Sequence, residues 1–311
     1  MKADVLVITK EMAHEQWLAA RKAGIGGSDA SAIAGLNKWK SPISVYMDKV
    51  GESPEEDIQS EAAHFGNVLE EVVAQEFSSR TGLKVRKRNA ILQHPNYPWM
   101  LANVDRLIIG EKVGLECKTA SEYLKKEWEG EEIPTSYLIQ CQHYMAVTGY
   151  EAWWIAVLIG GNKFIYKKIE RDEEVIQYLI DIEKDFWQNH VEKLAPPMFD
   201  GSDASTNLLK QMYPEGYDGS EVDLPSEAQD HILSIQNISE QIKELETQKK
   251  ERENKIKAMI GDQEKGIIGD YQATWKTVYS QRFDTKGFKA KHPELYEEFA
   301  KESVSRRFSV K

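Results

Sequence analysis

The spacing of apolar residues divides the first two thirds of the chain into helices and strands. Apolar side chains recur every three or four positions from about residue 61 to residue 80, which predicts a helix. Two further helices are expected at 134–148 and 172–194, where capping residues and a glycine stop mark the ends. Residues 153–159 and 163–169 form a predicted β-hairpin around a glycine-rich turn. This part of the chain is therefore long and regular enough to form one large domain.

The predicted helix 61–80 carries one polar residue at the edge of its apolar stripe. Glu70 lies one step from Leu69, and a glutamate in that place is usually solvated. The alternative is a carboxylate that points into a site. The residues expected to face inward are Phe65, Val68, Leu69, Val72, Val73 and Phe77.

A second β-hairpin is expected over residues 103–119. Gly110 and Glu111 form its two-residue turn, with glycine first as a type II′ turn prefers. A turn of this length places Asp105 directly opposite Glu116 on the neighbouring strand. Residues paired in this way have Cβ atoms about 4.5–5.5 Å apart. The hairpin is therefore expected to hold two carboxylates side by side.

The two faces of this hairpin differ in character. Side chains alternate along a strand, so Lys118 shares the face of Glu116, whereas Val113, Leu115 and Cys117 point to the opposite face. Two like charges opposed on paired strands are destabilising. A cation between the two carboxylates is the simplest reason for such an arrangement.

A glycine-rich loop, Gly24–Gly27, follows a helix that is predicted from about Glu11 to Lys22. Ser28 is expected to cap a short helix that ends near residue 34. Backbone N–H groups at such a helix start suit a phosphate, and Arg21 on the preceding helical turn could reach the same anion. The alternative is a corner between two helices that binds nothing.

Charge narrows the classes of function. The net charge is −11, from 40 Lys and Arg against 51 Asp and Glu, which argues against a passive nucleic-acid coat protein. It does not exclude an enzyme that acts on DNA. Lys84, Arg86, Lys87 and Arg88 fall within five residues that contain no acid. This cluster is either a solvated strand face or a track for phosphates.

Two absences bear on location and cofactors. The sequence has no run of 18 apolar residues, so no membrane span is expected, and no apolar signal core, so we expect a cytoplasmic protein (the host cytoplasm if a phage encodes it). Cys117 and Cys141 fit a reducing compartment. Two cysteines are too few for a Cys₄ iron–sulfur cluster or zinc site.

The remainder of the chain predicts a separate extension. We expect a first domain over residues 1–197, a Gly/Ser/Asp-rich connector over 198–224 and an extension over 225–311. The extension begins with a long charged helix at 226–260, whose isoleucine and leucine seam is too interrupted for a confident coiled coil. A β arm at 267–279 and short helices follow.

The hairpin residues support a comparison with a known family. Asp105, followed by Glu116 and Lys118, resembles the signature of the PD-(D/E)xK nuclease superfamily. Val104 stands where the signature has proline, a position that varies widely in the superfamily. The resemblance covers about residues 10–195. The short signature alone is weak, so the surrounding motifs decide its weight.

Five other positions match the motifs of this superfamily in order. Glu70 precedes the hairpin on a helix, and Gln140 and Tyr144 follow it one helical turn apart. Arg21 and Ser28 match the N-terminal motif of the branch that contains YqaJ-type phage recombinases and lambda exonuclease. Together these motifs identify a YqaJ-type or lambda-exonuclease-like member of the superfamily.

The resemblance implies a fold and an activity. The fold is a restriction-endonuclease-like α/β (α+β) core, with a mixed β-sheet flanked by helices and a helical C-terminal extension. The implied activity is Mg²⁺-dependent 5′→3′ digestion of linear double-stranded DNA, with one or two ions per site and Mn²⁺ as a substitute. The 3′ single strand would pass to a RecT-like annealing protein. Relatives form ring-shaped trimers, so a homo-oligomer is expected.

The resemblance also assigns roles to residues. Asp105, Glu116, the Cys117 carbonyl and Glu70 are the implied metal ligands, and Lys118 orients and helps to deprotonate the attacking water.

Outside the metal ligands, Gln140 positions the lysine or the water, and Tyr144 packs behind it. Arg21 and Ser28 would bind the terminal 5′-phosphate of the DNA. Gly27 belongs to the same phosphate loop, and the basic strand would contact the DNA backbone. The DNA-binding residues are therefore expected to be Arg21, Gly27, Ser28, Lys84, Arg86 and Arg88.

Three alternatives remain at this stage. An endonuclease of the same fold would need no pocket for a 5′ end, so loss of Arg21 would leave its activity largely intact. A non-catalytic DNA-binding module is disfavoured by the complete Asp, Glu and Lys set. An iron–sulfur nuclease of the same superfamily is disfavoured by the cysteine count.

Overall fold

The computed structural model describes residues 3–54, 60–302 and 304–310. The chain forms two compact units, Met1–Met212 and Tyr213–Lys311. This boundary falls inside the stretch 198–224 that the sequence predicts as a connector. Helix α7 (Asp203–Met212) groups with the first unit because its Leu208 is buried in a core cluster of that unit.

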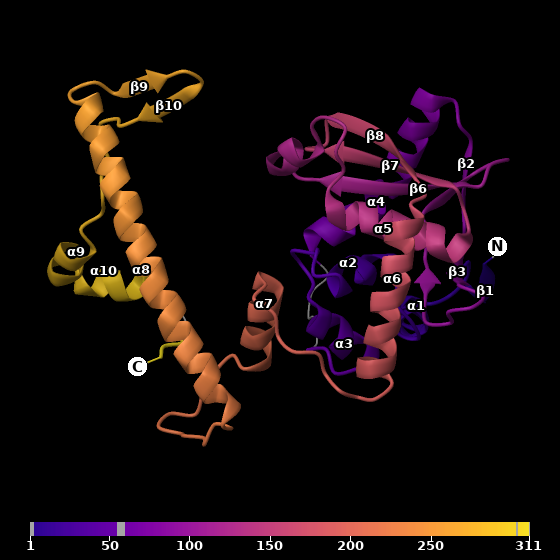
Figure 1. The fold of residues 1–311 in the computed structure, drawn as a ribbon, viewed down its shortest axis with the longest axis horizontal. Coiled ribbons are helices and arrows are strands. Elements are labelled where there is room, and N and C mark those ends of the chain that lie inside the picture. The colour runs from indigo at the N-terminus through magenta and orange to yellow at the C-terminus, as the bar shows by residue number, and fades with distance from the viewer. Residues whose placement is uncertain (1–2, 55–59, 303, 311) are drawn as a thin grey trace. The chain divides into compact units, whose positions relative to one another are not determined.

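A five-stranded mixed sheet forms the centre of the first unit. Its strand order is β2-β5-β6-β7-β8, and Figure 1 shows β6, β7 and β8 side by side. Strands β6 and β7 are parallel and every other neighbouring pair is antiparallel. The expected mixed sheet flanked by helices is confirmed. The strands are β2 (Val85–Lys87), β5 (Arg106–Ile108), β6 (Val113–Ala120), β7 (Ala152–Ile159) and β8 (Lys163–Glu170).

Two helices cover the opposite faces of this sheet. Helix α4 (Glu61–Thr81) packs Phe77 against the apolar face of β6 that carries Leu115 and Cys117. Helix α5 (Thr135–Thr148) connects β6 to β7 and lies over the other face, which carries Glu116. The expected alternation along β6 is confirmed, because its apolar and charged side chains point to different helices.

The apolar stripe of α4 differs from the predicted one. Phe65, Val68 and Val72 are exposed, whereas Val73 and Phe77 are buried against the sheet. The stripe that faces the sheet is shifted around the helix and is polar in its first half, where Glu70 meets Arg106. Hydrophobic spacing cannot find a stripe that turns polar where it reaches a site.

The hairpin between β5 and β6 has the predicted register. Arg106 lies opposite Leu115 and Leu107 opposite Gly114, so Asp105 lies opposite Glu116. Asp105 precedes β5, which is shorter than expected. Gly114 has no room for a side chain, because a Cβ there would lie 2.2 Å from the Trp153 ring.

The N-terminal part of the first unit supplies three helices and a small sheet. The predicted cap at Ser28 is wrong: Gly26 caps the second helix, and Ser28 is its second residue. Residues 83–92, for which the sequence predicts a strand or a strand pair, form two strands in different sheets, since β2 pairs with β5 whereas β3 pairs with β1 and β4. These elements are α1 (His14–Lys22), α2 (Gly27–Ile33), α3 (Pro42–Val50), β1 (Asp4–Ile8), β3 (Ala90–Gln93) and β4 (Leu101–Ala102).

Two further elements complete the first unit. The 3₁₀ segment η1 (Glu122–Trp128) follows β6, and α6 (Glu173–Phe186) follows β8 and continues as a π-helical turn, η2 (Trp187–Val191). Asp172 caps α6 as expected, since its carboxylate accepts hydrogen bonds from the first turn of the helix.

The second unit is built on one long helix. The expected helix and the two short helices are confirmed, but the β arm ends at Thr274, well before the predicted residue 279. No helix in the described part of the chain is long and apolar enough to cross a membrane. The elements are α8 (Glu227–Ile260), β9 (Lys265–Ile268), β10 (Tyr271–Thr274), α9 (Thr285–Lys291) and α10 (Pro293–Phe299).

Candidate active site

One cavity of about 290 Å³ brings together residues from seven elements and from the segment that enters β5. Helices α1, α2, α4 and α5 line it, together with strands β3, β4 and β6. Nine residues that the sequence singles out lie on its wall. They are Arg21, Gly27, Ser28, Glu70, Asp105, Glu116, Lys118, Gln140 and Tyr144.

Glu116 lies at the centre of a buried hydrogen-bond network. Its Oε1 accepts hydrogen bonds from Lys118 Nζ at 2.7 Å and from Gln140 Nε2 at 2.7 Å. Gln140 Nε2 also donates to the Tyr144 hydroxyl at 2.9 Å. The other carboxylate oxygen, Oε2, is buried and has no hydrogen-bond partner. Buried carboxylate oxygens are rarely left without a partner, so this atom marks a place for a ligand.

Asp105 is held beside Glu116 at an electrostatic penalty. Its Oδ2 accepts a hydrogen bond from the Cys117 backbone N–H at 2.8 Å. Burial, followed by the nearby charge of Glu116, raises the pKa of Asp105 well above its ordinary value. Lys118 opposes this rise but does not cancel it. The pair therefore carries more negative charge than its surroundings neutralise.

Lys118 is held as an ammonium group. Burial lowers the pKa of Lys118, but the charges of Glu116 and then Asp105 outweigh burial and raise the pKa above its ordinary value. Its Nζ also lies 5.1 Å from the centre of the Tyr137 ring, which is a favourable cation–π position. The lysine is therefore fixed beside the carboxylates as a charged hydrogen-bond donor.

The residues present fit a hard divalent cation. Asp105 and Glu116 supply oxygen donors, and the unpartnered Glu116 oxygen is free to bind one. Among the described residues no group of three or more His, Cys, Asp and Glu side chains forms a complete metal site. Mg²⁺ commonly binds one or two carboxylates and keeps several waters, so two carboxylates suffice.

Glu70 reaches the cavity but is engaged elsewhere. Its carboxylate pairs with the guanidinium of Arg106, which also donates to Glu71 Oε2 at 2.9 Å and to the Asp105 carbonyl at 2.8 Å. Arg106 is buried, and its pKa is raised because Glu70 outweighs the effect of burial. Among the described residues Arg106 engages only Oε1 of Glu70, so ligation of a metal by the other oxygen stays a prediction.

Arg21, Gly27 and Ser28 line the N-terminal side of the same cavity. The Arg21 guanidinium stacks over the Trp17 ring at 4.6 Å, which fixes its direction. Gly27 must be glycine, because a Cβ there would lie 2.6 Å from the Tyr144 ring. The glycine loop predicted to bind phosphate and the carboxylate site are therefore connected through Tyr144.

A second buried charge cluster, centred on Asp29, supports the glycine loop that is predicted to bind phosphate. Asp29 Oδ1 lies 2.7 Å from Lys40 Nζ, and its Oδ2 lies 2.7 Å from Lys49 Nζ. The same Oδ2 accepts a hydrogen bond from the Gly26 N–H at 3.1 Å. Burial raises the pKa of Asp29, but the two lysines outweigh burial and hold it far below its ordinary value. Asp29 therefore stays ionised and fixes the start of α2.

The basic strand is only partly connected to the site. Lys84 and Arg86 are exposed and do not line the cavity. Arg88 lines a neighbouring cavity of about 340 Å³, which shares Glu70 and Asp105 with the first. Of the three predicted DNA-binding residues in this basic cluster, the structure therefore brings only Arg88 near the carboxylates.

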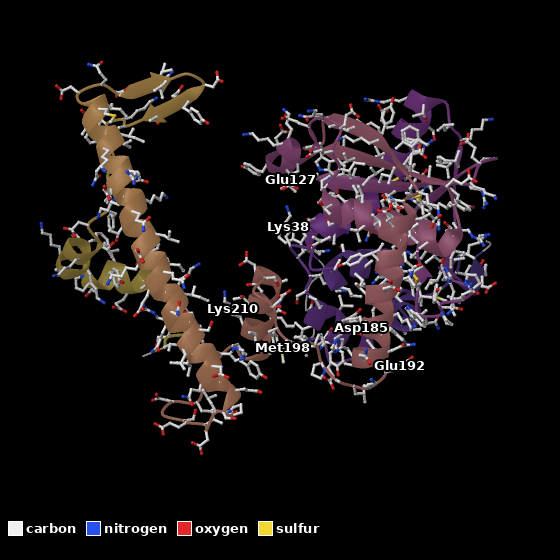
Figure 2. All side chains as sticks on the ribbon, in the orientation of Figure 1. Lys38, Glu127, Asp185, Glu192, Met198 and Lys210 are labelled. Atoms are coloured by element: carbon white, nitrogen blue, oxygen red, sulfur yellow. The ribbon has the colours of Figure 1, made fainter. Side chains whose placement is uncertain are left out.

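A third, smaller cavity of about 140 Å³ shares Ser28, Lys118 and Gln140 with the first. Lys38 and Glu127 reach toward each other across its wall, with Nζ and Oε1 3.1 Å apart (Figure 2). The candidate site is thus open toward the loop between α2 and α3 and toward η1.

Three residues around the site are absent from the sequence prediction. Arg106 and Asp29 act through partners distant in sequence, so no local pattern reveals them. Trp17 is different, because it stands four residues before Arg21 on one helix. The i, i+4 spacing of an aromatic and an arginine is a signal that could have found it.

Comparison with known proteins identifies the family. A family model described as a YqaJ-like viral recombinase domain matches residues 16–151, which include every candidate residue from Arg21 to Tyr144. The uncharacterized protein YqaJ of Bacillus subtilis (strain 168) is 50% identical over 312 residues, covering 100% of this chain and 98% of that protein. The chain belongs to the YqaJ family. The suspected relationship is confirmed.

A second, more distant relative is similar over part of the chain. The uncharacterized protein R354 of Acanthamoeba polyphaga mimivirus is 23% identical over 214 residues, 64% of this chain and 34% of that protein.

Two exonuclease structures show weak likeness. The alkaline exonuclease LHK-Exo of Laribacter hongkongensis, solved with dAMP, is 21% identical with a TM-score of 0.49, covering 58% of this chain and 95% of that one. A phage-related exonuclease from Haemophilus somnus 129PT is 14% identical with a TM-score of 0.43, covering 55% and 96%. At these scores the likeness assigns no role to any residue here.

Proposed function

We propose that this chain is a metal-dependent nuclease that digests linear double-stranded DNA from a 5′ end and leaves a 3′ single strand. The observation that carries the proposal is the unpartnered Glu116 oxygen beside Asp105 and Lys118, in the same cavity as Arg21 and Ser28. Membership of a family described by a viral recombinase domain agrees with this reaction.

The carboxylates would hold the catalytic metal. Asp105 and Glu116 are the two side-chain ligands, with the Cys117 carbonyl and waters completing the shell, and Mn²⁺ could replace Mg²⁺. When bound, the metal supplies charge stabilisation at the scissile phosphate and a more acidic water. Glu70 could join the shell through Oε2, since Arg106 engages Oε1.

Lys118 and Gln140 would orient the reacting groups. Lys118 Nζ and Gln140 Nε2 both donate to Glu116 Oε1, so they fix the direction in which Oε2 points. As an ammonium, Lys118 can donate a hydrogen bond to the attacking water and stabilise negative charge that develops on the phosphate. Tyr144 holds Gln140 from behind.

Arg21 and Ser28 would hold the terminal 5′-phosphate. An arginine binds phosphate through several donors at once, and the Trp17 ring restrains this one toward the cavity. Helix α2 has seven residues, so its dipole adds little and the side chains carry the recognition. An anchor for the 5′ end next to the carboxylates would make cleavage depend on a DNA end. Arg88 is the basic-strand residue best placed to contact the duplex.

The wider setting of the reaction follows from the family resemblance alone. A RecT-like annealing protein as partner for the 3′ strand and a ring of three copies stay predictions.

The test compares linear duplex DNA carrying a 5′-phosphate with closed circular duplex DNA, each incubated with Mg²⁺. We expect mononucleotides from the linear substrate only, with a label at the 5′ terminus released first. Lys118→Ala should abolish the release. Nicking of the circle at a comparable rate would contradict the exonuclease proposal. Inactivity with every divalent metal would favour a DNA-binding module.

One further variant distinguishes the exonuclease proposal from the endonuclease alternative. Arg21→Ala should weaken digestion of 5′-phosphorylated ends and bring it to the level of 5′-hydroxyl ends. If the variant digests both ends as fast as the unmodified protein digests phosphorylated ends, the anchor has no role and an endonuclease becomes the better assignment.

A further inference from the structure

The second unit has almost no hydrophobic core. Among its described residues Ile260 is the only apolar side chain that is buried. Large apolar side chains are exposed along α8, along the β9–β10 hairpin and after it. Exposed apolar surface of this extent marks an interaction site. The residues after the hairpin show what kind of partner fits.

Residues 275–291, here called the aromatic–basic segment, alternate rings with positive charges. The segment contains four aromatic residues, five Lys and Arg, and one acid, in a chain whose overall charge is −11. The acid, Asp284, accepts a hydrogen bond from the Gly287 N–H at 2.9 Å as the cap of α9. The segment therefore presents a local positive charge within an acidic protein. Its aromatic residues are Trp275, Tyr279, Phe283 and Phe288.

Three of these rings are available to a ligand. Trp275 is 50%, Tyr279 94% and Phe283 71% exposed. Residues 275–284 form neither helix nor strand, so the backbone leaves the ring faces uncovered. The three rings recur every four residues along the chain. Exposed rings at regular intervals suit a ligand that offers one flat surface after another.

The positive charges of the segment are also free to bind. Within the described residues, Lys289 pairs with Glu297 at 3.8 Å, whereas the other four basic side chains have no acid at ion-pairing distance. All five are exposed. These four are Lys276, Arg282, Lys286 and Lys291.

We propose that the aromatic–basic segment is a binding site for single-stranded DNA. Stacking of bases on aromatic rings, combined with basic side chains along the phosphates, is the usual way in which proteins hold single strands without reading their sequence. Arg306, Arg307 and Phe308, all exposed, repeat the same combination near the end of the chain. The proposal goes beyond the nuclease reaction, because it needs neither a metal nor a DNA end.

Single-stranded DNA fits better than the other candidates. In a duplex the base faces are already stacked on one another, so the exposed rings would find no free surface. A second copy of the chain would bring the same positive charges together, which is unfavourable. A purely apolar protein partner would leave the four unpaired basic side chains without a counter-charge.

The test measures binding of the full-length protein to closed circular single-stranded DNA in EDTA. A circle has no 5′ end for Arg21 and Ser28, and EDTA removes the metal, so failure of the proposed nuclease function would not affect the result. We expect the double variant Tyr279→Ala/Phe283→Ala to bind at least about tenfold more weakly. Arg282→Ala should also weaken binding and reduce its dependence on salt concentration.

Phe299→Ala is the matched control. Phe299 is 76% exposed in the same unit but directly follows two acids, Glu297 and Glu298. We expect its binding to match the unmodified protein. Circular dichroism should show α8 intact in every variant, because the substituted rings are exposed.

Two outcomes would overturn the proposal. Unchanged binding of single-stranded DNA by the double variant would show that the rings take no part in DNA binding. If the double variant instead shifts the protein to a smaller assembly in sedimentation while binding DNA normally, the segment is an interface between copies.

Discussion

The first unit contains two buried charge clusters that are built on opposite principles. Around Asp29, one carboxylate meets two lysines, and every charged group has a partner. Around Glu116, two carboxylates meet one lysine, and one buried oxygen has none. The first cluster lowers the pKa of its aspartate and the second raises it. A cluster that is neutralised internally fixes structure, whereas one that is left negative is prepared for a cation.

The largest expected effect is on activity when the negative cluster loses a ligand. Asp105→Asn keeps the size of the side chain and its hydrogen bond from Cys117 but removes the charge that would hold the metal. We expect nuclease activity to fall by about a thousandfold, or ~4 kcal/mol of activation free energy. Asp181→Asn, an exposed aspartate on α6, is the control and should remain fully active. Comparable loss in both variants would mean that folding, and not ligation, is affected.

The next effect is on stability when the neutralised cluster loses its carboxylate. Lys49 has a side chain only 2% exposed, so Asp29→Asn leaves this buried lysine with the partly exposed Asp48, 3.3 Å away, as its counter-charge. We expect the free energy of unfolding to fall by about 3 kcal/mol, measured by urea denaturation. Asp48→Asn is the control: Asp48 contacts the same two lysines but is a third exposed, so its loss should cost under about 1 kcal/mol.

The lowered pKa of Asp29 determines how the difference in the free energy of unfolding between the unmodified protein and Asp29→Asn depends on pH. A carboxyl whose pKa is lower in the folded state stabilises the fold above its unfolded pKa of 3.8, and this contribution disappears as pH falls toward the folded pKa. The gap between the unmodified protein and Asp29→Asn should therefore be constant from pH 8 to about pH 5 and narrow only below pH 3.8. A gap that changes near neutral pH would assign the stabilisation to another group.

The third effect tests whether the negative cluster is completed by a cation. Mg²⁺ at a hundred times its dissociation constant should raise the free energy of unfolding by about 2.7 kcal/mol, seen as a higher melting temperature. Glu116→Gln should lose this response, since it replaces the unpartnered oxygen by an amide. An equal response in the variant would place the metal elsewhere.

The two clusters were not equally predictable from sequence. Turn length and strand alternation are local rules, so they fixed the pairing of Asp105 with Glu116 and the face that Lys118 shares. Lys49 reaches Asp29 across twenty residues, and Arg106 reaches Glu70 across thirty-six, and no local spacing encodes such contacts.

The same limit explains the errors elsewhere in the prediction. The stripe of α4 was misplaced because the side of the helix that faces the sheet is polar where Glu70 meets Arg106. Helix α7 lies in the stretch predicted as a connector, since its burial depends on a distant core cluster. The β arm was extended through Tyr279 because aromatic residues favour strands, yet no neighbouring strand pairs with them.

The smallest effect is on the free energy of unfolding, which should change in opposite directions when each cluster loses its aspartate. Without metal, Asp105→Asn should stabilise the protein by about 1 kcal/mol, because it removes the repulsion between Asp105 and Glu116. Asp29→Asn removes no such repulsion. The raised pKa of Asp105 gives the pH dependence: stability of the unmodified protein falls as pH rises from its unfolded pKa of 3.8 through its higher folded pKa. The variant should lack this decline, measured by urea denaturation in EDTA at a series of pH values. A destabilised variant would mean that the carboxylate is already compensated in the fold, and the contrast between the two clusters would be lost.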